Sequence, residues 1–374
     1  MALNFTVPIP IVNVKNETLV RPEILRRSFV IHYLSIYALL LTIFGTIGNV
    51  LTIVVLFRRH LRRFVTVRYL IAVSICDIIS LYGWNLNNFY KFNISRVGGN
   101  IEDLSLVHCR LISFMTFVAL QLSSWYLSAV SLDRCLSLYW LQWKQSYGRI
   151  RYTKYYLIFL TLTCLTVNSH ILFLNGYSTS SNGAVCYRTR TNYHYIYPQW
   201  ERVHLVLYNL CPFAIMCICN TYIIYVTVKS SRSHNLGGPN RNNRKSLERY
   251  RQFTALLIIV TFAFVILTLP ACIYFVFFRN DFALTTQRNY RYMIQIFLNS
   301  IQFTCHGINF FLYCFSASSF RHELYGMFRE LVYHCRCKCG WLHLNDRQNI
   351  HMRRYKHGNH TNASPLERQR TCHA

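Results

Sequence analysis

Residues that could do chemistry stand at the two ends of one apolar run, residues 106–140. Cys109 lies near its start, and the pair Asp133-Arg134 lies near its end. No charged side chain lies between Arg110 and Asp133, a stretch long enough to cross a bilayer as a helix. Arg134 follows Cys109 by 25 residues, a rise of about 37 Å in a helix, or one membrane crossing with its interfaces. The pattern predicts a helix with a thiol at one membrane face and an ionic pair at the other.

Sequence signatures of catalysis are missing. The chain has no HExxH motif, no paired carboxylates and no G-x-S-x-G motif, so we expect no enzyme activity. One cluster near the C-terminus, Cys335, Cys337 and Cys339 beside His334, could bind a metal. The same cysteines follow a membrane-proximal segment and could instead be palmitoylated. Palmitoylation is the prediction, and metal binding stays open as the alternative.

Composition and charge place the chain in a membrane. Apolar residues make up 53% of its 374 residues and charged residues 14%, against roughly 25% charged in ordinary globular domains. A net charge of +27 would indicate nucleic-acid binding in a soluble protein. Here the basic residues concentrate in short segments between apolar runs. The sequence therefore predicts a lipid bilayer as partner and no nucleic acid.

Seven apolar runs can serve as spans. They are residues 29–57, 67–90, 106–139, 153–176, 201–228, 252–278 and 290–315. The segments 58–68, 134–154, 229–251 and 316–374 hold 27 of the 40 Lys and Arg residues. Because an excess of Lys and Arg marks the cytoplasmic side, we expect a multi-pass plasma-membrane protein with its N-terminus outside and its C-terminus in the cytoplasm. That orientation needs an odd number of spans, and seven satisfies it.

These features divide the chain into four parts. We expect an extracellular segment 1–28, a seven-helix domain 29–315, an amphipathic helix 316–332 and a cytoplasmic tail 333–374, because apolar and basic residues alternate after Phe315. The first residues lack a basic region and a long apolar stretch, so we expect no cleaved signal peptide. Gly237-Gly238-Pro239 predicts a flexible cytoplasmic loop over 229–251. Glycosylation sequons at Asn4, Asn16 and Asn93 lie on the expected outer side.

Polar side chains inside the apolar runs indicate function. Asn49 lies in the first run and Asp77 in the second, and a carboxylate in the middle of a membrane helix is costly without a role. Fifteen cysteines are scattered through the chain. Of these, Cys109 and Cys186 lie at expected outer positions, where the two can pair.

The ordered set of these residues resembles the rhodopsin-like (class A) G-protein-coupled receptors. The residues that carry the resemblance occur in the family's order and are Asn49, Asp77, Cys109, Asp133, Arg134, Cys186, Pro212, Phe264, Pro270, Asn309 and Tyr313. The resemblance covers about residues 30–330. It implies an all-α seven-helix membrane bundle that binds an extracellular ligand and activates a heterotrimeric G protein, with arrestin as a further partner.

The resemblance assigns roles to several residues. It implies a disulfide between Cys109 and Cys186, which ties a loop hairpin at Asn182-Gly183 to the third span. It also implies a G-protein switch, in which the acid beside Arg134 holds that arginine at rest and releases it on activation. The switch residues are Asp133, Arg134, Phe264, Pro270, Asn309 and Tyr313.

A sodium ion is the one cofactor that the resemblance suggests. In the family, the carboxylate on the second span holds the ion together with polar groups of the third and seventh spans. Asp77, Ser123 and Asn309 stand at these positions, with Asn49 in the same polar network, but Cys305 replaces a usual asparagine. A protonated Asp77 in a hydrogen-bond network without an ion is the alternative.

Three residues depart from the family's pattern. Thr268 stands where a tryptophan is usual, Asn220 where a tyrosine is usual, and Phe310 where a proline is usual. Phe264 and Pro270 still supply a bulky residue and a bend in the sixth span. We therefore expect a working switch that does not depend on a tryptophan.

Ligand classes can be narrowed by resemblance. Amine receptors carry an aspartate where this chain has Thr116, and retinal proteins need a lysine that is missing from 292–315. The stretches 168–176 and 208–213 resemble invertebrate neuropeptide receptors of the FMRFamide-receptor-like group. We therefore expect an extracellular peptide ligand, contacting Thr116, Gln121, Tyr208, Phe275, Gln295 and Asn299. An orphan chemosensory-type receptor is the nearer alternative, and a seven-helix transporter or channel the more distant one.

Overall fold

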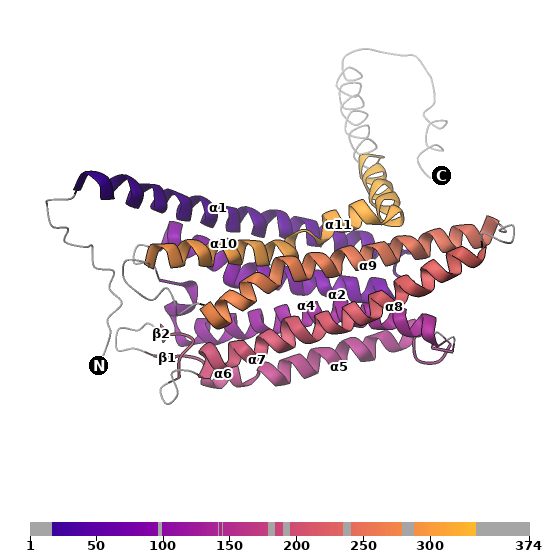
Figure 1. The fold of residues 1–374 in the computed structure, drawn as a ribbon, viewed down its shortest axis with the longest axis horizontal. Coiled ribbons are helices and arrows are strands. Elements are labelled where there is room, and N and C mark those ends of the chain that lie inside the picture. Colours follow the sequence, from indigo (N-terminus) through magenta and orange to yellow (C-terminus); the bar gives the residue numbers. More distant parts are fainter. Residues whose placement is uncertain are drawn as a thin grey trace, which may run out of the picture. The chain divides into compact units, whose positions relative to one another are not determined.

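The computed structural model describes residues 17–95, 99–140, 142–143, 145–178, 184–189, 195–234, 241–278 and 288–333. The chain divides into two compact units, Met1–Ser318 and Ser319–Ala374. The first unit is a bundle of long helices that lie roughly side by side (Figure 1). The described residues thus form the expected all-α bundle, with one short β hairpin.

The first half of the bundle contains four long helical segments. They are α1 (Glu17–Leu56), α2 (Val65–Ser80), α4 (Leu106–Tyr139) and α5 (Ile150–Asn168), the last followed by α6 (His170–Leu174). α2 continues through a π-helical turn η1 (Leu81–Asn85), α3 (Leu86–Phe89) and a second π-helical turn η2 (Tyr90–Ile94). A 3₁₀ turn, η3 (Ile101–Leu104), precedes α4.

The second half contains the remaining helices. They are η4 (Tyr195–Trp200), α7 (Glu201–Leu205), η5 (Val206–Leu210), α8 (Cys211–His234), α9 (Arg241–Ile273), η6 (Tyr274–Phe278), α10 (Arg288–Gly307) and α11 (Asn309–Ser316). Helix α4 is central, because it packs against α2, α5 and α8. The helix that carries Cys109, Asp133 and Arg134 therefore lies in the middle of the bundle.

Six helical segments are long and apolar enough to cross a membrane: Phe29–Leu56, Val65–Ile94, Leu106–Tyr139, Ile150–Leu174, Glu201–Lys229 and Ala255–Phe278. The seventh expected run is divided between α10 and α11 and carries many polar residues, so it is amphipathic rather than uniformly apolar. It lies between α1 and α9 (Figure 1). A polar seventh helix is stable there because its polar face packs inside the bundle.

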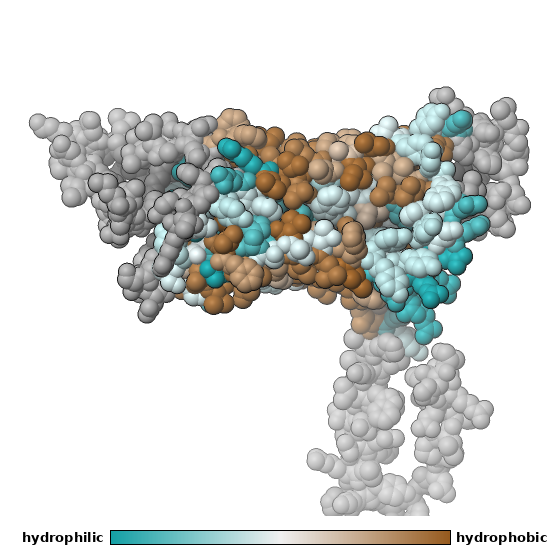
Figure 2. Space-filling view, turned by 90° about the horizontal axis from the view of Figure 1, so that it is seen from below, coloured by the Kyte–Doolittle hydropathy of each residue, from teal (hydrophilic) through white to brown (hydrophobic). Residues whose placement is uncertain are grey.

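The surface of the bundle carries an apolar band. Figure 2 shows hydrophobic residues over the middle of the visible face and hydrophilic residues toward its two ends. Large apolar side chains are exposed on several helices, among them Phe159, Ile218 and Phe262. Apolar surface of this extent is unusual on a soluble monomer and suits contact with lipid.

A bend in α2 depends on one glycine. Gly83, within η1, has non-helical dihedral angles (φ −76°, ψ −117°). A Cβ at this position would collide with the side chain of Thr116 on α4. The small residue therefore lets the two helices approach closely, and it holds Thr116 in a helix–helix contact.

The hairpin expected near Asn182-Gly183 is present in part. Strands β1 (Tyr177–Ser178) and β2 (Ala184–Val185) pair antiparallel, with Tyr177 opposite Val185. The expected turn itself lies outside the described residues. The hairpin lies at the same end of the bundle as η3 and the start of α4, which β2 contacts.

Two expectations about helix ends can be compared with the structure. The loop expected over 229–251 is wrong in its extent, because α8 continues to His234 and α9 begins at Arg241. The basic and polar residues there include good helix formers, so helices project beyond the apolar spans. Residues 318–333 form a further helix, as expected for 316–332. Its place on the inner membrane surface stays a prediction.

Candidate functional site

The expected disulfide is present. Cys109 at the start of α4 is bonded to Cys186, the residue after β2. The next residue, Tyr187, has a left-handed backbone (φ 63°), which is uncommon outside glycine. Its N–H donates to Asn175 Oδ1 at 2.9 Å, which helps to hold this conformation. The bond and the turn together fix the direction of the Tyr187 side chain.

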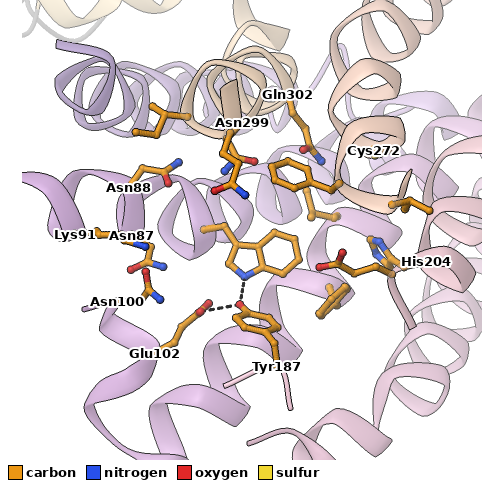
Figure 3. Close-up of a pocket in the computed structure, with 18 of the residues that line it drawn as sticks. Asn87, Asn88, Lys91, Asn100, Glu102, Tyr187, His204, Cys272, Asn299 and Gln302 are labelled. Atoms are coloured by element: carbon orange, nitrogen blue, oxygen red, sulfur yellow. Dashed lines mark hydrogen bonds between the residues drawn. The ribbon is translucent and has the colours of Figure 1, made fainter. Parts of the chain in front are cut away.

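Tyr187 points into a cavity of about 220 Å³, here called the Tyr187 cavity. Figure 3 shows its polar lining, which comes from the α2–α3 segment, η3, the loop after β2 and the second half of the bundle. Six amide side chains line it: Asn87, Asn88, Asn100, Gln295, Asn299 and Gln302. Aromatic residues complete the walls: Trp84, Phe92, Phe117, Tyr187, Tyr208, Phe275 and Tyr292. The cavity combines apolar walls with several hydrogen-bonding groups, as binding pockets do.

Four of the six residues expected to contact a ligand line this cavity, namely Tyr208, Phe275, Gln295 and Asn299. The other two do not line it. Thr116 is buried against Gly83, and Gln121 accepts a hydrogen bond from Asn168 Nδ2 at 2.7 Å. Both side chains are buried on α4, where contacts with neighbouring helices occupy them.

A hydrogen-bonded chain of three side chains lies in the cavity wall, and the sequence reasoning missed it. Trp84 Nε1 donates to the Tyr187 hydroxyl at 2.5 Å, and that hydroxyl donates to Glu102 Oε2 at 2.7 Å (Figure 3). The three residues come from η1, the loop after β2 and η3. Their separation in sequence, 85 residues between Glu102 and Tyr187, explains why no local pattern could reveal them.

The electrostatics of the cavity depend on Glu102. Burial raises the pKa of this carboxyl from 4.5 to about 7, and nearby Asp103 adds to the rise. Hydrogen bonds from Tyr187 and Trp84 and the charge of Lys91 oppose it. Burial and the neighbouring Glu102 also raise the pKa of Tyr187 well above its ordinary value. Tyr187 therefore stays a neutral donor, while Glu102 changes charge near neutral pH.

Several buried polar atoms of the lining lack a hydrogen-bond partner among the described residues. Three of them are Asn88 Nδ2, Glu102 Oε1 and His204 Nε2, and Glu102 and His204 are only 1% and 6% exposed. A buried polar atom without a partner is costly, so such atoms indicate a missing partner. Lys91 supplies a cation, with Nζ 5.1 Å from the centre of the Tyr292 ring and 5.7 Å from that of Phe92.

A second polar centre surrounds Asp77 in the middle of the bundle. Asp77 is fully buried. Ser123 Oγ donates to its Oδ1 at 2.7 Å, and Asn309 Nδ2 donates to its Oδ2 at 2.6 Å. His306 Nδ1 lies 2.7 Å from the same Oδ1. The structure brings Asp77, Ser123 and Asn309 together as expected, and it adds His306, which the sequence reasoning missed.

Asn49 contacts this centre from α1. Its Nδ2 donates to the backbone carbonyl of His306 at 2.9 Å rather than to Asp77 itself. The residues present do not fit a sodium ion, because nitrogen or hydroxyl donors already occupy both carboxylate oxygens. Hard cations prefer oxygen ligands, and Asn309 presents its nitrogen and His306 a ring nitrogen to the site. Three donors around Asp77 suit an ionised carboxylate in a hydrogen-bond network, which differs from the alternative of a protonated Asp77; both stay predictions.

Two residues of the expected switch, Asp133 and Arg134, lie near the other end of α4. Asp133 Oδ1 accepts a hydrogen bond from Trp143 Nε1 at 3.0 Å, and Arg134 Nε donates to Thr66 Oγ1 on α2 at 2.8 Å. Trp143 lies in the segment between α4 and α5. The acid and the base are thus each tied to a neighbouring element, and their role as a switch stays a prediction.

Two of the three departures from the family's pattern form matching contacts. Asn209 Nδ2 donates to Thr268 Oγ1 at 2.9 Å, and Asn220 Nδ2 donates to Thr261 Oγ1 at 2.8 Å. Both bonds join the η5–α8 segment to α9. Phe264 on α9 is fully buried and packs edge-on against Tyr208, with ring centres 5.7 Å apart. The residues that stand in place of the family's usual ones therefore still connect these two helical segments.

Several modification sites cannot be compared with the structure. Asn4, Asn16 and the cysteines Cys335, Cys337 and Cys339 lie outside the described residues. Asn93 lies inside, where its Nδ2, the atom that would carry a glycan, donates to Ser35 Oγ at 2.6 Å. Glycosylation of Asn93 stays a prediction, which this contact disfavours. Within the described ranges, no group of three or more His, Cys, Asp or Glu side chains is placed to hold a metal ion.

Comparison with known proteins gives one family and a set of distant relatives. The model of the family described as 7 transmembrane receptor (rhodopsin family) matches residues 48–313. Cysteinyl leukotriene receptor 1 of Sus scrofa is 22% identical over 242 residues, which cover 64% of this chain and 66% of that protein. The receptors of that name from Cavia porcellus and Homo sapiens are 22% identical over 243 residues and 20% identical over 242, with the same coverage. The chain thus spans just under two thirds of these relatives.

Proposed function

Because the chain belongs to the rhodopsin family of seven-transmembrane receptors, we propose that it binds an extracellular ligand in the Tyr187 cavity and activates a heterotrimeric G protein. The protein then lies in the plasma membrane, with the hairpin outside and the Asp133-Arg134 end in the cytoplasm. Arrestin is a further partner under this proposal. The observation that carries it is the cavity itself, with buried polar atoms that have no described partner.

The size of the cavity limits what enters it. Its volume of about 220 Å³ lies below the range of roughly 300–1,000 Å³ that encloses a drug-sized ligand. The end of a longer ligand fits this space better than a whole one. The remainder of such a ligand would contact the loops above the cavity.

The chemistry of the lining favours a peptide end over an anionic lipid. Six amide side chains can pair with peptide amides through both their N–H and C=O groups. Glu102 and Glu201 place two carboxyl groups in the lining, against the single lysine, Lys91, among its described residues. A carboxylate-bearing lipid would face these acids, whereas a peptide amine or amide could donate to Glu102 Oε1. We therefore infer an amide-rich ligand, and a neuropeptide is the best example.

The relatives supply the rival ligand. Their name states that they bind cysteinyl leukotrienes, and Lys91 could pair with a carboxylate of such a lipid. Cells that express the chain should be exposed in parallel to amidated neuropeptides and to cysteinyl leukotrienes, with calcium and cAMP as readouts. A response to peptides supports the proposal. A response confined to the leukotrienes refutes the peptide assignment, and ligand-independent ion flux would indicate a channel.

A pair of phenylalanines on η6 gives a matched test of the cavity. Phe275 lines the cavity, whereas Phe277 is 58% exposed and does not line it. Phe275→Ala should lower the potency of the active ligand, and Phe277→Ala should leave it unchanged at equal surface expression. Asn299→Ala should act like Phe275→Ala. Unchanged potency in Phe275→Ala and Asn299→Ala would place the binding site elsewhere.

A further inference from the structure

His306 joins the two polar centres of the bundle. Its Nδ1 lies 2.7 Å from Asp77 Oδ1, and its Nε2 lies 3.3 Å from the Tyr208 hydroxyl. Tyr208 lines the Tyr187 cavity, and Asp77 also accepts from Asn309 at the start of α11. One buried side chain, 1% exposed, therefore spans the distance between the cavity and the Asp77 centre.

Neighbouring residues fix the position of His306. Its backbone carbonyl accepts from Asn49 Nδ2 at 2.9 Å, and α10 ends at the next residue, Gly307, so that Ile308 alone lies between α10 and α11. Gly307 allows close contact with α1, since a Cβ there would lie 2.7 Å from Leu41 Cδ1. His306 and Asn309 are three residues apart and so lie on one helical face, from which both reach the same carboxylate.

The hydrogen-bond partners determine how the imidazole is used. An ionised Asp77 can only accept, so Nδ1 must carry the proton that it donates to Oδ1. In the neutral ring, Nε2 is then an acceptor and takes its hydrogen bond from the Tyr208 hydroxyl. Together with Ser123 and Asn309, the carboxylate receives three donors. These donors balance a buried carboxylate, which otherwise requires a cation.

We propose that His306 takes the place of a bound sodium ion at Asp77 and connects that carboxylate to Tyr208 in the ligand cavity. A ligand that contacts Tyr208 then perturbs the hydrogen bonds of Asp77 and Asn309 through His306, and no ion is released. The ion-replacement half stands independently of the receptor function, whereas the transmission half rests on the proposed function.

The ion-replacement half is tested by thermal unfolding of the purified full chain in lipid nanodiscs, in sodium chloride and in choline chloride at equal ionic strength. The wild-type midpoint should be the same in both salts. In His306→Ser the imidazole is gone and a small oxygen ligand remains, so sodium should raise the midpoint by a few degrees. Sodium-specific stabilisation of the wild type overturns the proposal. A folded His306→Ser variant whose unfolding midpoint is the same in both salts also overturns it.

His306→Asn separates the two contacts. The asparagine amide nitrogen can occupy the place of Nδ1 and donate to Asp77, but the side chain is too short to reach Tyr208. This variant should remain insensitive to sodium like the wild type. A sodium response in His306→Asn would mean that the donor to Asp77 does not exclude the ion. The wild-type comparison needs no variant and so remains decisive where a substitution prevents folding.

The transmission half is tested by a double-mutant cycle on ligand-independent nucleotide exchange by a reconstituted G protein. Tyr208→Phe removes the hydroxyl, and His306→Asn removes the ring nitrogen that accepts from it. If the contact transmits, the double variant should change basal exchange by the same factor as either single variant. If the double variant instead changes basal exchange by the product of the two single-variant factors, the transmission half is overturned. Absence of exchange in the wild type both without ligand and with the peptides and leukotrienes tested above would refute the proposed function and leave the ion result standing.

Discussion

Glu102→Gln should remove a pH dependence from the stability of the protein. Glu102 is buried on η3, and burial raises the pKa of its carboxyl from 4.5 to about 7. The folded state therefore holds this proton more tightly than the unfolded state does. Its contribution to stability is fully present below about pH 4.5 and is lost as the pH rises through about 7.

The size of the effect follows from the same shift. A rise from 4.5 to about 7 corresponds to about 3 kcal/mol, at roughly 1.4 kcal/mol for each pKa unit. Two hydrogen bonds and Lys91 already oppose the rise, and Asp103 adds to it. Glutamine has nearly the same shape and can still accept from the Tyr187 hydroxyl, but it cannot titrate. The variant should therefore lack this loss of stability.

The assay is thermal unfolding of wild type and variant in nanodiscs, at pH values from below 4.5 to above 7. Histidines titrate in the same interval, so the informative quantity is the difference between the two midpoints at each pH. The wild type should lose stability relative to Glu102→Gln as the pH rises, with most of the change complete just above pH 7. Parallel midpoints over the whole interval would refute the reasoning, since they would mean that Glu102 is not desolvated.

Three further predictions concern the rest of the bundle. Cys109→Ser or Cys186→Ser should lower the free energy of unfolding by about 2–4 kcal/mol, measured by denaturation of each variant. Peptide mapping of the wild type without reduction should recover both cysteines in one fragment, and a free thiol at either position would contradict the disulfide. Asn220→Ala removes a hydrogen bond to α9 and should raise basal G-protein nucleotide exchange, whereas unchanged exchange would show that this bond does not restrain the helix. Asp133→Asn should raise basal signalling, and Arg134→Ala should abolish the agonist response at normal surface expression; a full response from Arg134→Ala would reject the switch.

The sequence was informative where one residue type has few physical alternatives. Runs of apolar residues predicted the spans, and two cysteines at one face of the bundle predicted the disulfide. Asp77 was identified as central because a carboxylate within a membrane span needs partners, and the structure gives it three. These inferences depend on local composition or on the cost of burial, both of which the sequence displays directly.

The residues that sequence reasoning missed depend on contacts between distant segments. Glu102 stands in a short polar turn beside Asp103, where an exposed carboxylate would be ordinary. Its buried carboxyl accepts a hydrogen bond from Tyr187, whose direction is fixed by the disulfide and by Asn175. His306 lies three residues before Asn309 and could have been suspected, because a histidine within a membrane span is also costly. The expectation centred instead on its neighbour Cys305.

The departures from the family's pattern occur with compensating partners. Thr268 lies against Asn209, and Asn220 lies against Thr261, so each replacing residue forms a hydrogen bond between the η5–α8 segment and α9. Such bonds join side chains of ordinary size, and they can break and re-form without moving a large ring.

The third departure, Phe310, is accommodated in a different way. A Cβ at Gly48 of α1 would lie 3.1 Å from the Cβ of Phe310, so this phenylalanine lies close against α1. The helix still breaks between Gly307 and Asn309 without a proline. His306 and Asn309, three residues apart on one helical face, both contact Asp77, so the loss of the proline leaves intact the geometry by which α10 and α11 hold this carboxylate. These two residues supply two of the three donors on which the proposed replacement of a sodium ion rests.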